Sequence, residues 1–227
     1  MSSGMQNDIK TLAYVLRRTN YGEADRILNF ITPDGKKSAI AKGVRKSKSK
    51  LAGGIEIFSL VELNIHFGRG ELGVITGARM LKYYSKILVD YERMELAAWV
   101  LKRVSLAAES VDNPEYFRII EQVFTELDNG TNVPLVESWA ILNLRKAIGE
   151  EINVYRDTNG DKLVLDEKYN WNTMEMAFSK DRLGEFSTNE IKMLRLLLSA
   201  DLKITKRIKD YEMIIPKILA LVKTLNR

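Results

Sequence analysis

The spacing of apolar residues changes near residue 80, and this change most constrains how the chain can fold. From Leu60 to Phe67 the odd positions from 61 are apolar, and the even positions from 62 to 66 are polar. This period of two is that of a half-buried strand. Beyond residue 80 apolar residues recur every three to four positions, as in Met94, Ala97 and Leu101, which predicts amphipathic helices. The sequence therefore predicts an α+β protein in which strands precede helices.

Five short strands are expected before residue 80, at 10–19, 26–32, 36–42, 60–67 and 71–79. Turn sequences separate them at Tyr21-Gly22, at Pro33-Asp34-Gly35, across a long loop near 43–54 and at Gly68-Arg69-Gly70. Five strands with one long link between the third and the fourth are typical of a small closed barrel of the OB type. We therefore predict an OB-type barrel domain at residues 6–80.

The rest of the chain, residues 81–227, is predicted to form a helical domain. Helical stripes cover 94–108, 116–127, 134–148, 191–198 and 214–225, and Ser187 with Glu190 forms a capping box before the fourth stripe. Residues 150–186 interrupt the pattern. They predict a hairpin of 152–155 with 162–165 around the turn Asn159-Gly160. A small satellite core is expected to follow, made of Trp171, Met174, Met176 and Phe178.

Positive charge is concentrated in the predicted barrel. Residues 1–80 carry 13 Lys and Arg against 7 Asp and Glu, whereas residues 81–227 carry 22 against 23. From Lys36 to Lys50 there are seven cations and no acid. Such a run can be a solvated loop, and it can also be a polyanion site, because Lys and Arg displace the counterions condensed on phosphates.

The absence of cysteine and the single histidine, His66, exclude several kinds of chemistry. Disulfides, a thiol nucleophile, cysteine-ligated zinc and a Ser-His-Asp or Cys-His unit beyond His66 cannot be built. No apolar run has the roughly 18 residues of a membrane helix, since Pro216 and Lys217 interrupt the best candidate. The N-terminus lacks the layout of a signal peptide, so we expect a soluble intracellular protein with no membrane partner.

Two motifs are interpreted as structural. Gly68 to Gly73 matches G-x-G-x-x-G, but a strand rather than a helix follows, so a hairpin turn is expected instead of a dinucleotide site. Asp157, Asn159, Asp161 and Asp166 fail the spacing of a calcium loop in both registers that we tried. No metal or other cofactor is expected.

The residues best placed to hold nucleic acid are basic residues on or between the predicted strands. OB barrels bind oligonucleotides across strands 2 and 3 and their neighbouring loops. We expect one continuous basic surface with little sequence preference, formed by Arg26, Lys36, Lys37, Lys42, Arg45, Lys46, Lys48, Lys50 and Arg69. Tyr14 and Tyr21 are stacking candidates that could equally be core or turn residues.

Segments of the first 80 residues resemble the bacterial DNA repair and recombination mediator family RecO. The resemblance rests on Tyr21 to Arg26, Thr32-Pro33, Ala41 to Lys46, Ser49 to Gly54, Phe58 to Leu63 and Arg69 to Gly73. It is specific over roughly residues 10–80 and loose beyond, where the helical layout and Asn113-Pro114 are similar.

The resemblance implies an N-terminal OB domain followed by a helical domain. It implies binding of single- and double-stranded DNA, annealing of complementary strands and help in loading recombinase. The implied partners are RecR and single-stranded DNA-binding protein, in a cytoplasmic, nucleoid-associated setting. Many members carry a four-cysteine zinc module near the position of residues 150–186, and this chain cannot hold one because it has no cysteine.

Three hypotheses follow, and the first is preferred. The chain is a non-enzymatic DNA-binding and annealing mediator, or an OB-plus-helix adaptor whose barrel binds protein, or a divalent-metal nuclease. The carboxylates available to a nuclease are Asp8, Glu23, Asp25, Glu62 and Glu71, with no telling spacing among them.

Overall fold

The computed structural model describes residues 7–68, 70, 72–164 and 166–225. The chain divides into two compact units, Met1–Asp128 and Asn129–Arg227.

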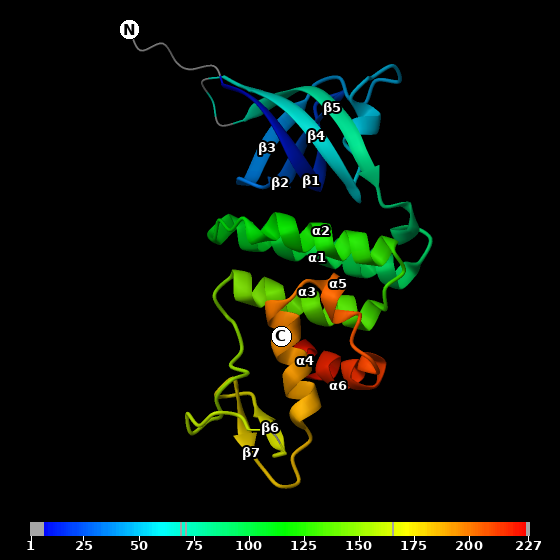
Figure 1. The fold of residues 1–227 in the computed structure, drawn as a ribbon. Coiled ribbons are helices and arrows are strands. Elements are labelled where there is room, and N and C mark those ends of the chain that lie inside the picture. The colour runs from blue at the N-terminus through cyan, green and yellow to red at the C-terminus, as the bar shows by residue number, and fades with distance from the viewer. Residues whose placement is uncertain (1–6, 69, 71, 165, 226–227) are drawn as a thin grey trace. The chain divides into compact units, whose positions relative to one another are not determined.

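The first unit contains a closed five-stranded barrel with the strand order β1-β2-β3-β5-β4 (Figure 1). The strands are β1 (Asn7–Tyr21), β2 (Asp25–Thr32), β3 (Gly35–Ala41), β4 (Ser59–Phe67) and β5 (Gly73–Tyr83). Pairing is antiparallel except between β3 and β5, which run in parallel. Alternate residues fill the interior, among them Val15, Phe30 and Leu63. The predicted α+β class and OB-type barrel are confirmed.

A strand, β5, follows the glycine-rich turn, as the hairpin interpretation requires. Arg69 and Glu71 of this turn lie outside the described residues. Gly73 allows close packing at the end of the turn, because a Cβ there would lie 2.5 Å from Cγ2 of Ile65.

Two helices complete the first unit: α1 (Tyr91–Ser110) and α2 (Glu115–Asp128), after the short η2 (Ser85–Ile87). Asp90 caps α1 by accepting a hydrogen bond from the Arg93 amide at 3.1 Å. Phe124 of α2 packs edge-on against Tyr14 of β1 and against Tyr84, with ring centroids 5.6 and 5.4 Å apart. These aromatic contacts join α2 to the barrel, and α1 contacts it through Lys36 of β3, whose ammonium group pairs with Glu109 at 3.2 Å.

The compact units therefore divide later than the predicted boundary between residues 80 and 81. The predicted boundary follows the change from strands to helices near residue 80. However, α1 and α2 belong to the same compact unit as the barrel, and the spacing of apolar residues does not reveal the contacts that hold them there. As a statement about domains, the division at residue 80 stays a prediction.

The second unit is helical, with a small two-stranded sheet. Its elements are α3 (Val133–Ala147), β6 (Tyr169–Asn172), β7 (Ala177–Lys180), α4 (Thr188–Ser199), α5 (Leu202–Thr205) and α6 (Tyr211–Thr224). The buried helix α3 packs against α4 and α6. The predicted capping box of Ser187 and Glu190 is present at the start of α4.

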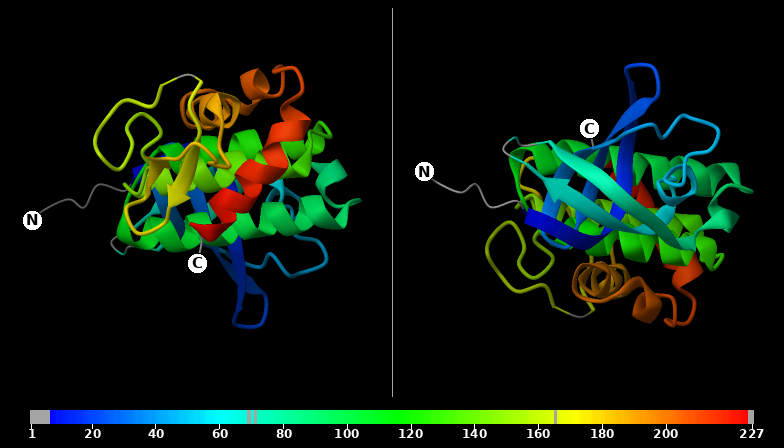
Figure 2. Two further views of the ribbon diagram at one scale, coloured as in Figure 1. Left: turned by 90° about the horizontal axis from the view of Figure 1, so that it is seen from below. Right: turned by 90° about the horizontal axis from the view of Figure 1, so that it is seen from above.

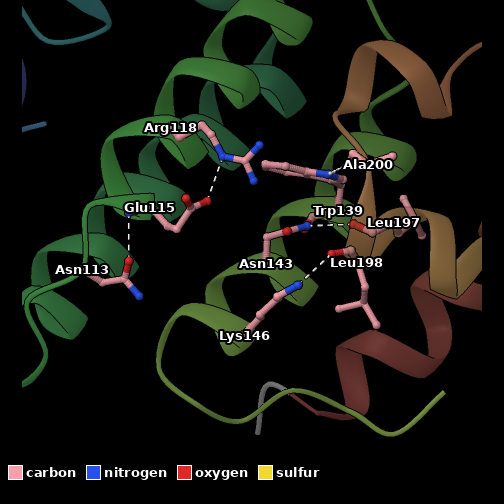
Figure 3. Close-up of polar contacts among 9 residues, drawn as sticks. All are labelled: Asn113, Glu115, Arg118, Trp139, Asn143, Lys146, Leu197, Leu198 and Ala200. Carbon is pink, nitrogen blue, oxygen red and sulfur yellow. Dashed lines mark hydrogen bonds and ion pairs between the residues drawn. The ribbon is translucent and has the colours of Figure 1, made fainter. Parts of the chain in front are cut away.

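Three side chains of α3 satisfy carbonyl groups at the end of α4 (Figure 3). Trp139 donates to Ala200 at 3.0 Å, Asn143 to Leu197 at 2.9 Å and Lys146 to Leu198 at 3.1 Å. The last carbonyls of a helix have no partner within the helix, so these donors fix the end of α4 and the direction of the chain beyond it.

The interruption at 150–186 is partly as predicted. A turn at Asn159-Gly160 is present, with a bridge between Arg156 and Lys162, but the paired strands there are β6 and β7. Phe178 is fully buried against Trp171, whereas Met174 is 97% exposed, so its assignment to the satellite core is wrong. Leu165 lies outside the described residues.

Within the described ranges, no helix combines the length and the apolar character needed to cross a bilayer.

Candidate nucleic-acid interface

The basic loop, residues 43–54 between β3 and β4, is folded onto the barrel. Val44 is 3% exposed and belongs to the barrel core, and Leu51 packs against that core. The short η1 (Ala52–Gly54) lies so close to β5 that a Cβ on Gly54 would be 2.6 Å from the Ala78 carbonyl oxygen. Backbone hydrogen bonds from Lys46 to Gly43 and from Ser49 to Lys46 form its turns. The loop therefore presents its side chains from a fixed backbone.

All four cations of this loop point to solvent. Arg45, Lys46, Lys48 and Lys50 are exposed, and in the described part of the chain none of them makes an ion pair. Arg45 approaches only a carbonyl, that of Gly22, at 3.4 Å. Four unneutralised cations on a short, anchored loop produce a local positive potential that attracts polyanions.

The turn between β1 and β2 lies beside the start of this loop (Figure 2, right). The Arg45 amide donates to the Ala24 carbonyl at 2.9 Å, and the Gly43 amide donates to the Asp25 carboxylate at 2.7 Å. Lys42 is exposed at the end of β3, and Arg26 pairs with Ala41 across β2 and β3. The structure thus brings Arg26, Lys42 and Arg45, at the start of the loop, to one end of the barrel.

Lys36 and Lys37 lie at the other end of β3, which separates them from that cluster. The Lys36 ammonium donates to the Ser105 carbonyl at 3.0 Å and pairs with Glu109 of α1 at 3.2 Å. Lys37 is half-buried, on the strand face that carries the core residues Ala39 and Ala41. Lys36 is therefore occupied by a contact inside the unit. Arg69, the last predicted contact, lies outside the described residues.

The two stacking candidates have different surroundings. Tyr14 is fully buried, and its hydroxyl lies 3.0 Å from that of Tyr84. Burial raises the pKa of Tyr14 far above its usual value, and the neighbouring Tyr84 raises it further. Tyr21 is 56% exposed at the β1–β2 turn, beside the glycine whose carbonyl Arg45 approaches. Of these two candidates, Tyr21 is the one whose ring is accessible to a nucleotide base.

Three of the carboxylates considered for a nuclease have separate partners. Asp8 pairs with His66 at 2.6 Å, Asp25 holds the Gly43 amide, and Glu62 lies between Lys10 and Arg79. Over the described ranges, no three His, Asp or Glu side chains are grouped to hold a metal ion.

A groove of about 570 Å³ in the first unit had no signal in the sequence. Distant segments line it, among them β1, residues 56–58 and α1. Their members include Leu16, Arg17, Phe58, Leu101, Lys102 and Leu106. Arg17 and Lys102 are exposed, whereas Arg18 is paired with Glu56 at 2.7 Å. Only the folded chain brings these residues together, so neither local spacing nor local charge could reveal the groove.

Comparison with known proteins shows which family the barrel resembles. Residues 5–84 match the family model described as Recombination protein O N terminal. The chain is 33% identical over 145 residues to the DNA repair protein RecO of Dehalococcoides mccartyi, covering 63% of this chain and 57% of that protein. It is 32% identical over 147 residues to RecO of Roseiflexus sp., covering 64% and 52%. With RecO of Listeria welshimeri the identity is 25% over 190 residues, covering 80% and 74%.

The first two of these matches span little more than half the length of the relative. The family model covers the barrel and ends just after β5, so it applies to the part of the chain that carries the basic loop. The resemblance to RecO is confirmed, and residues 5–84 match the N-terminal region that the recombination protein O model describes.

Proposed function

We propose that this chain is a DNA-binding mediator of recombinational DNA repair that acts without catalysing a reaction. The observation that carries the proposal is the anchored basic loop with its four exposed cations, on a barrel of the recombination protein O family. The relatives are named DNA repair proteins, which agrees with a polyanion as ligand.

The cations would bind the phosphate backbone rather than the bases. Each Lys or Arg that neutralises a phosphate releases condensed counterions, which favours binding irrespective of sequence. Single and double strands both offer such phosphates. Tyr21 would add a stacking contact to an unpaired base beside the loop.

Annealing would follow from this binding without a chemical step. Two strands repel each other through their phosphates, and neutralisation lowers that repulsion while base pairing supplies the favourable free energy. The proposal extends to loading of recombinase with RecR, to contact with single-stranded DNA-binding protein, and to a cytoplasmic, nucleoid-associated location.

The test is the salt dependence of single-stranded DNA binding, measured by fluorescence anisotropy. If about five phosphates are engaged, log K should fall with log[salt] with a slope of about −3.5. Replacing Arg45, Lys46, Lys48 and Lys50 with Ala should remove most of that slope, about 3 of it, for any sequence. The fold should persist, because these four side chains are exposed.

A matched control removes the same charge elsewhere. Lys162, Lys168, Arg182 and Lys192 are exposed and, among described residues, make no ion pair, so their replacement with Ala should leave the slope nearly unchanged. Equal slopes for the wild-type chain and the loop variant would disprove the assignment of the loop as the DNA site.

The groove beside α1 favours the adaptor as the second candidate function. Its apolar residues Leu16, Leu101 and Leu106 could receive side chains of a protein partner. If the wild-type chain shows no affinity for single-stranded DNA in low salt, the adaptor is the better account. Loss of intact substrate only in the presence of Mg²⁺ would instead support a nuclease.

A further inference from the structure

A second group of cations lies in the unit formed by Asn129–Arg227. The segment 202–209, which begins with α5, contains Lys203, Lys206, Arg207 and Lys209 and no acid. Lys206 is half-buried, whereas the other three are exposed. We call these three, Lys203, Arg207 and Lys209, the α5 cluster.

The backbone beneath this cluster is held in place. Leu202 and Thr205 are fully buried, and the turn after α5 is closed by hydrogen bonds from Arg207 to Ile204 and from Ile208 to Thr205. The chain just before α5 is fixed as well, since the Trp139 side chain donates a hydrogen bond to the Ala200 carbonyl (Figure 3). The cluster is thus presented from an anchored segment, as the basic loop is.

The cluster lacks neutralising partners. Within the described ranges, none of its three cations makes an ion pair, whereas Lys180, Lys217 and Lys223 of the same unit are paired with glutamates. Asp201 and Asp210 flank the segment without removing its excess of cations. A cation with no ion-pair partner keeps its full charge for a polyanion, so binding a polyanion is more favourable here than at a paired lysine.

Apolar side chains are exposed between and beside these cations. Ile204 is 52% exposed, Ile208 is 42% exposed and Met213 of α6 is 84% exposed. A surface of cations and aliphatic groups fits a nucleic-acid strand, which offers phosphates and apolar sugar and base faces. An anionic membrane surface fits less well, because α5 has one helical turn and membrane-surface helices present a long apolar face.

We propose that the α5 cluster is a second nucleic-acid contact, which holds the phosphate backbone of a second strand. The inference rests on the proposed function, since it requires that the basic loop holds the first strand. One chain with two such sites holds two strands at once, which raises the effective concentration of each for the other.

The experiment measures capture of a second strand. A short single-stranded oligonucleotide is immobilised, the full chain is added, and a labelled, non-complementary oligonucleotide of the same length is supplied. The wild-type chain should capture the labelled strand. The variant Lys203→Ala/Arg207→Ala/Lys209→Ala should capture at least about tenfold less, because about three phosphate contacts are lost. Its affinity for one oligonucleotide should remain within about twofold of the wild type, because the basic loop is intact.

Two control variants separate position and charge from loss of folding. Lys162→Ala/Lys168→Ala/Arg182→Ala removes the same charge from exposed positions of the same unit and should capture normally. Lys203→Arg/Lys209→Arg keeps the charge and should also capture normally. Thermal melting of each variant verifies that the fold is retained.

Undiminished capture by the α5 variant, with normal binding of one strand, would overturn the inference and leave the proposed function standing. So would an equal loss in the charge-matched control. If the α5 variant lost binding to phosphatidylglycerol vesicles but captured the labelled strand normally, the ligand of the α5 cluster would be a membrane surface instead of a second strand. A wild-type chain that binds no single strand would overturn the proposed function first, and the α5 cluster with it.

Discussion

Tyr14 and Tyr84 place two phenol hydroxyl groups in an apolar environment where the barrel meets α2. Both residues are at most 1% exposed, their oxygens lie 3.0 Å apart, and the rings of Phe117 and Phe124 cover Tyr14. The shared hydrogen bond satisfies hydroxyl groups whose burial would otherwise be costly. Desolvation raises the pKa of both tyrosines, because the phenolate would have to lie in the same apolar site.

These raised pKa values predict a loss of stability in alkali. Above about pH 10 the unfolded chain releases the tyrosine protons while the folded chain retains them, so the free energy of unfolding falls as the pH rises. Each such tyrosine contributes a decrease of up to about 1.4 kcal/mol per pH unit. Urea denaturation between pH 8 and 11 should show a shallower decrease for Tyr14→Phe than for the wild type.

The exposed Tyr21 provides the control for this effect. Tyr21→Phe should retain the full wild-type pH dependence, because it leaves the buried pair of Tyr14 and Tyr84 intact. If Tyr14→Phe and Tyr21→Phe gave parallel curves, the buried tyrosines would not be the source of the alkaline decrease. The comparison also cancels the titration of lysines, which the variants share.

Single residues show where sequence reasoning reached its limit. The pattern located Lys36 on the third strand, but its partners Ser105 and Glu109 lie about 70 residues further along the chain. Alternation in β1 could not decide whether Tyr14 faced solvent or core, because α2 covers that end of the barrel. A cation or an aromatic ring can contact a ligand only if no distant element covers it. The residues next to it in the sequence do not show whether such an element does.

At the scale of elements, residues 150–186 are held by aromatic rings in a chain that has no cysteine. Phe178 of β7 is fully buried, with ring centroids 5.1 Å from Trp171, 5.4 Å from Phe186 and 6.5 Å from Tyr169. Its carbonyl also accepts a hydrogen bond from the Thr158 amide at 2.9 Å, which joins the Asn159-Gly160 turn to the sheet. Phe178 is therefore the centre of this region.

Truncating the ring cluster should destabilise this region in proportion to burial. Phe178→Ala should lower the free energy of unfolding by about 3–5 kcal/mol, and the half-buried Trp171 should cost less, about 1–3 kcal/mol. Met174→Ala is the control on the same hairpin and should change stability little, because Met174 is 97% exposed. Chemical denaturation of the three variants measures these differences, and an unchanged melting temperature for Trp171→Ala would contradict the packing role.

Most elements were predictable because they follow one period over their full length. All five barrel strands and the helices α1, α2, α3, α4 and α6 lie where the apolar pattern predicts them. In residues 150–164 the described backbone makes isolated bridges, Arg156 with Lys162 and Asp157 with Phe178, rather than a hairpin of two strands. The reason is that turn residues specify a reversal but not the pairing beyond it. Pro216 lies inside α6, where the packed residues Ile215, Ile218 and Val222 offset its missing hydrogen bond.

At the scale of the whole molecule, the distribution of charge matters more than its sum. The net charge of +5 combines a net +6 over residues 1–80 with a net −1 over residues 81–227. In residues 81–227 the total charge is nearly zero because acids elsewhere offset the cations of segment 202–209. Some of those acids pair with other lysines, such as Lys217 and Lys223, so the charge of the segment itself remains positive. A polyanion responds to local potential, so two sites can exist on a chain whose total charge is modest.

Two sites on one chain also predict how strand capture depends on protein concentration. Capture of a labelled strand by an immobilised one should rise as protein is added, because each chain links two strands. It should then fall once chains outnumber strands, because each strand binds its own chain and few links remain. Bridging through association of chains would instead rise to a plateau, since excess protein adds further links. Titration of the full chain against a fixed pair of non-complementary oligonucleotides distinguishes the two, and a plateau would contradict a two-site chain. The α5 variant, which retains the basic loop, should give low capture at every protein concentration.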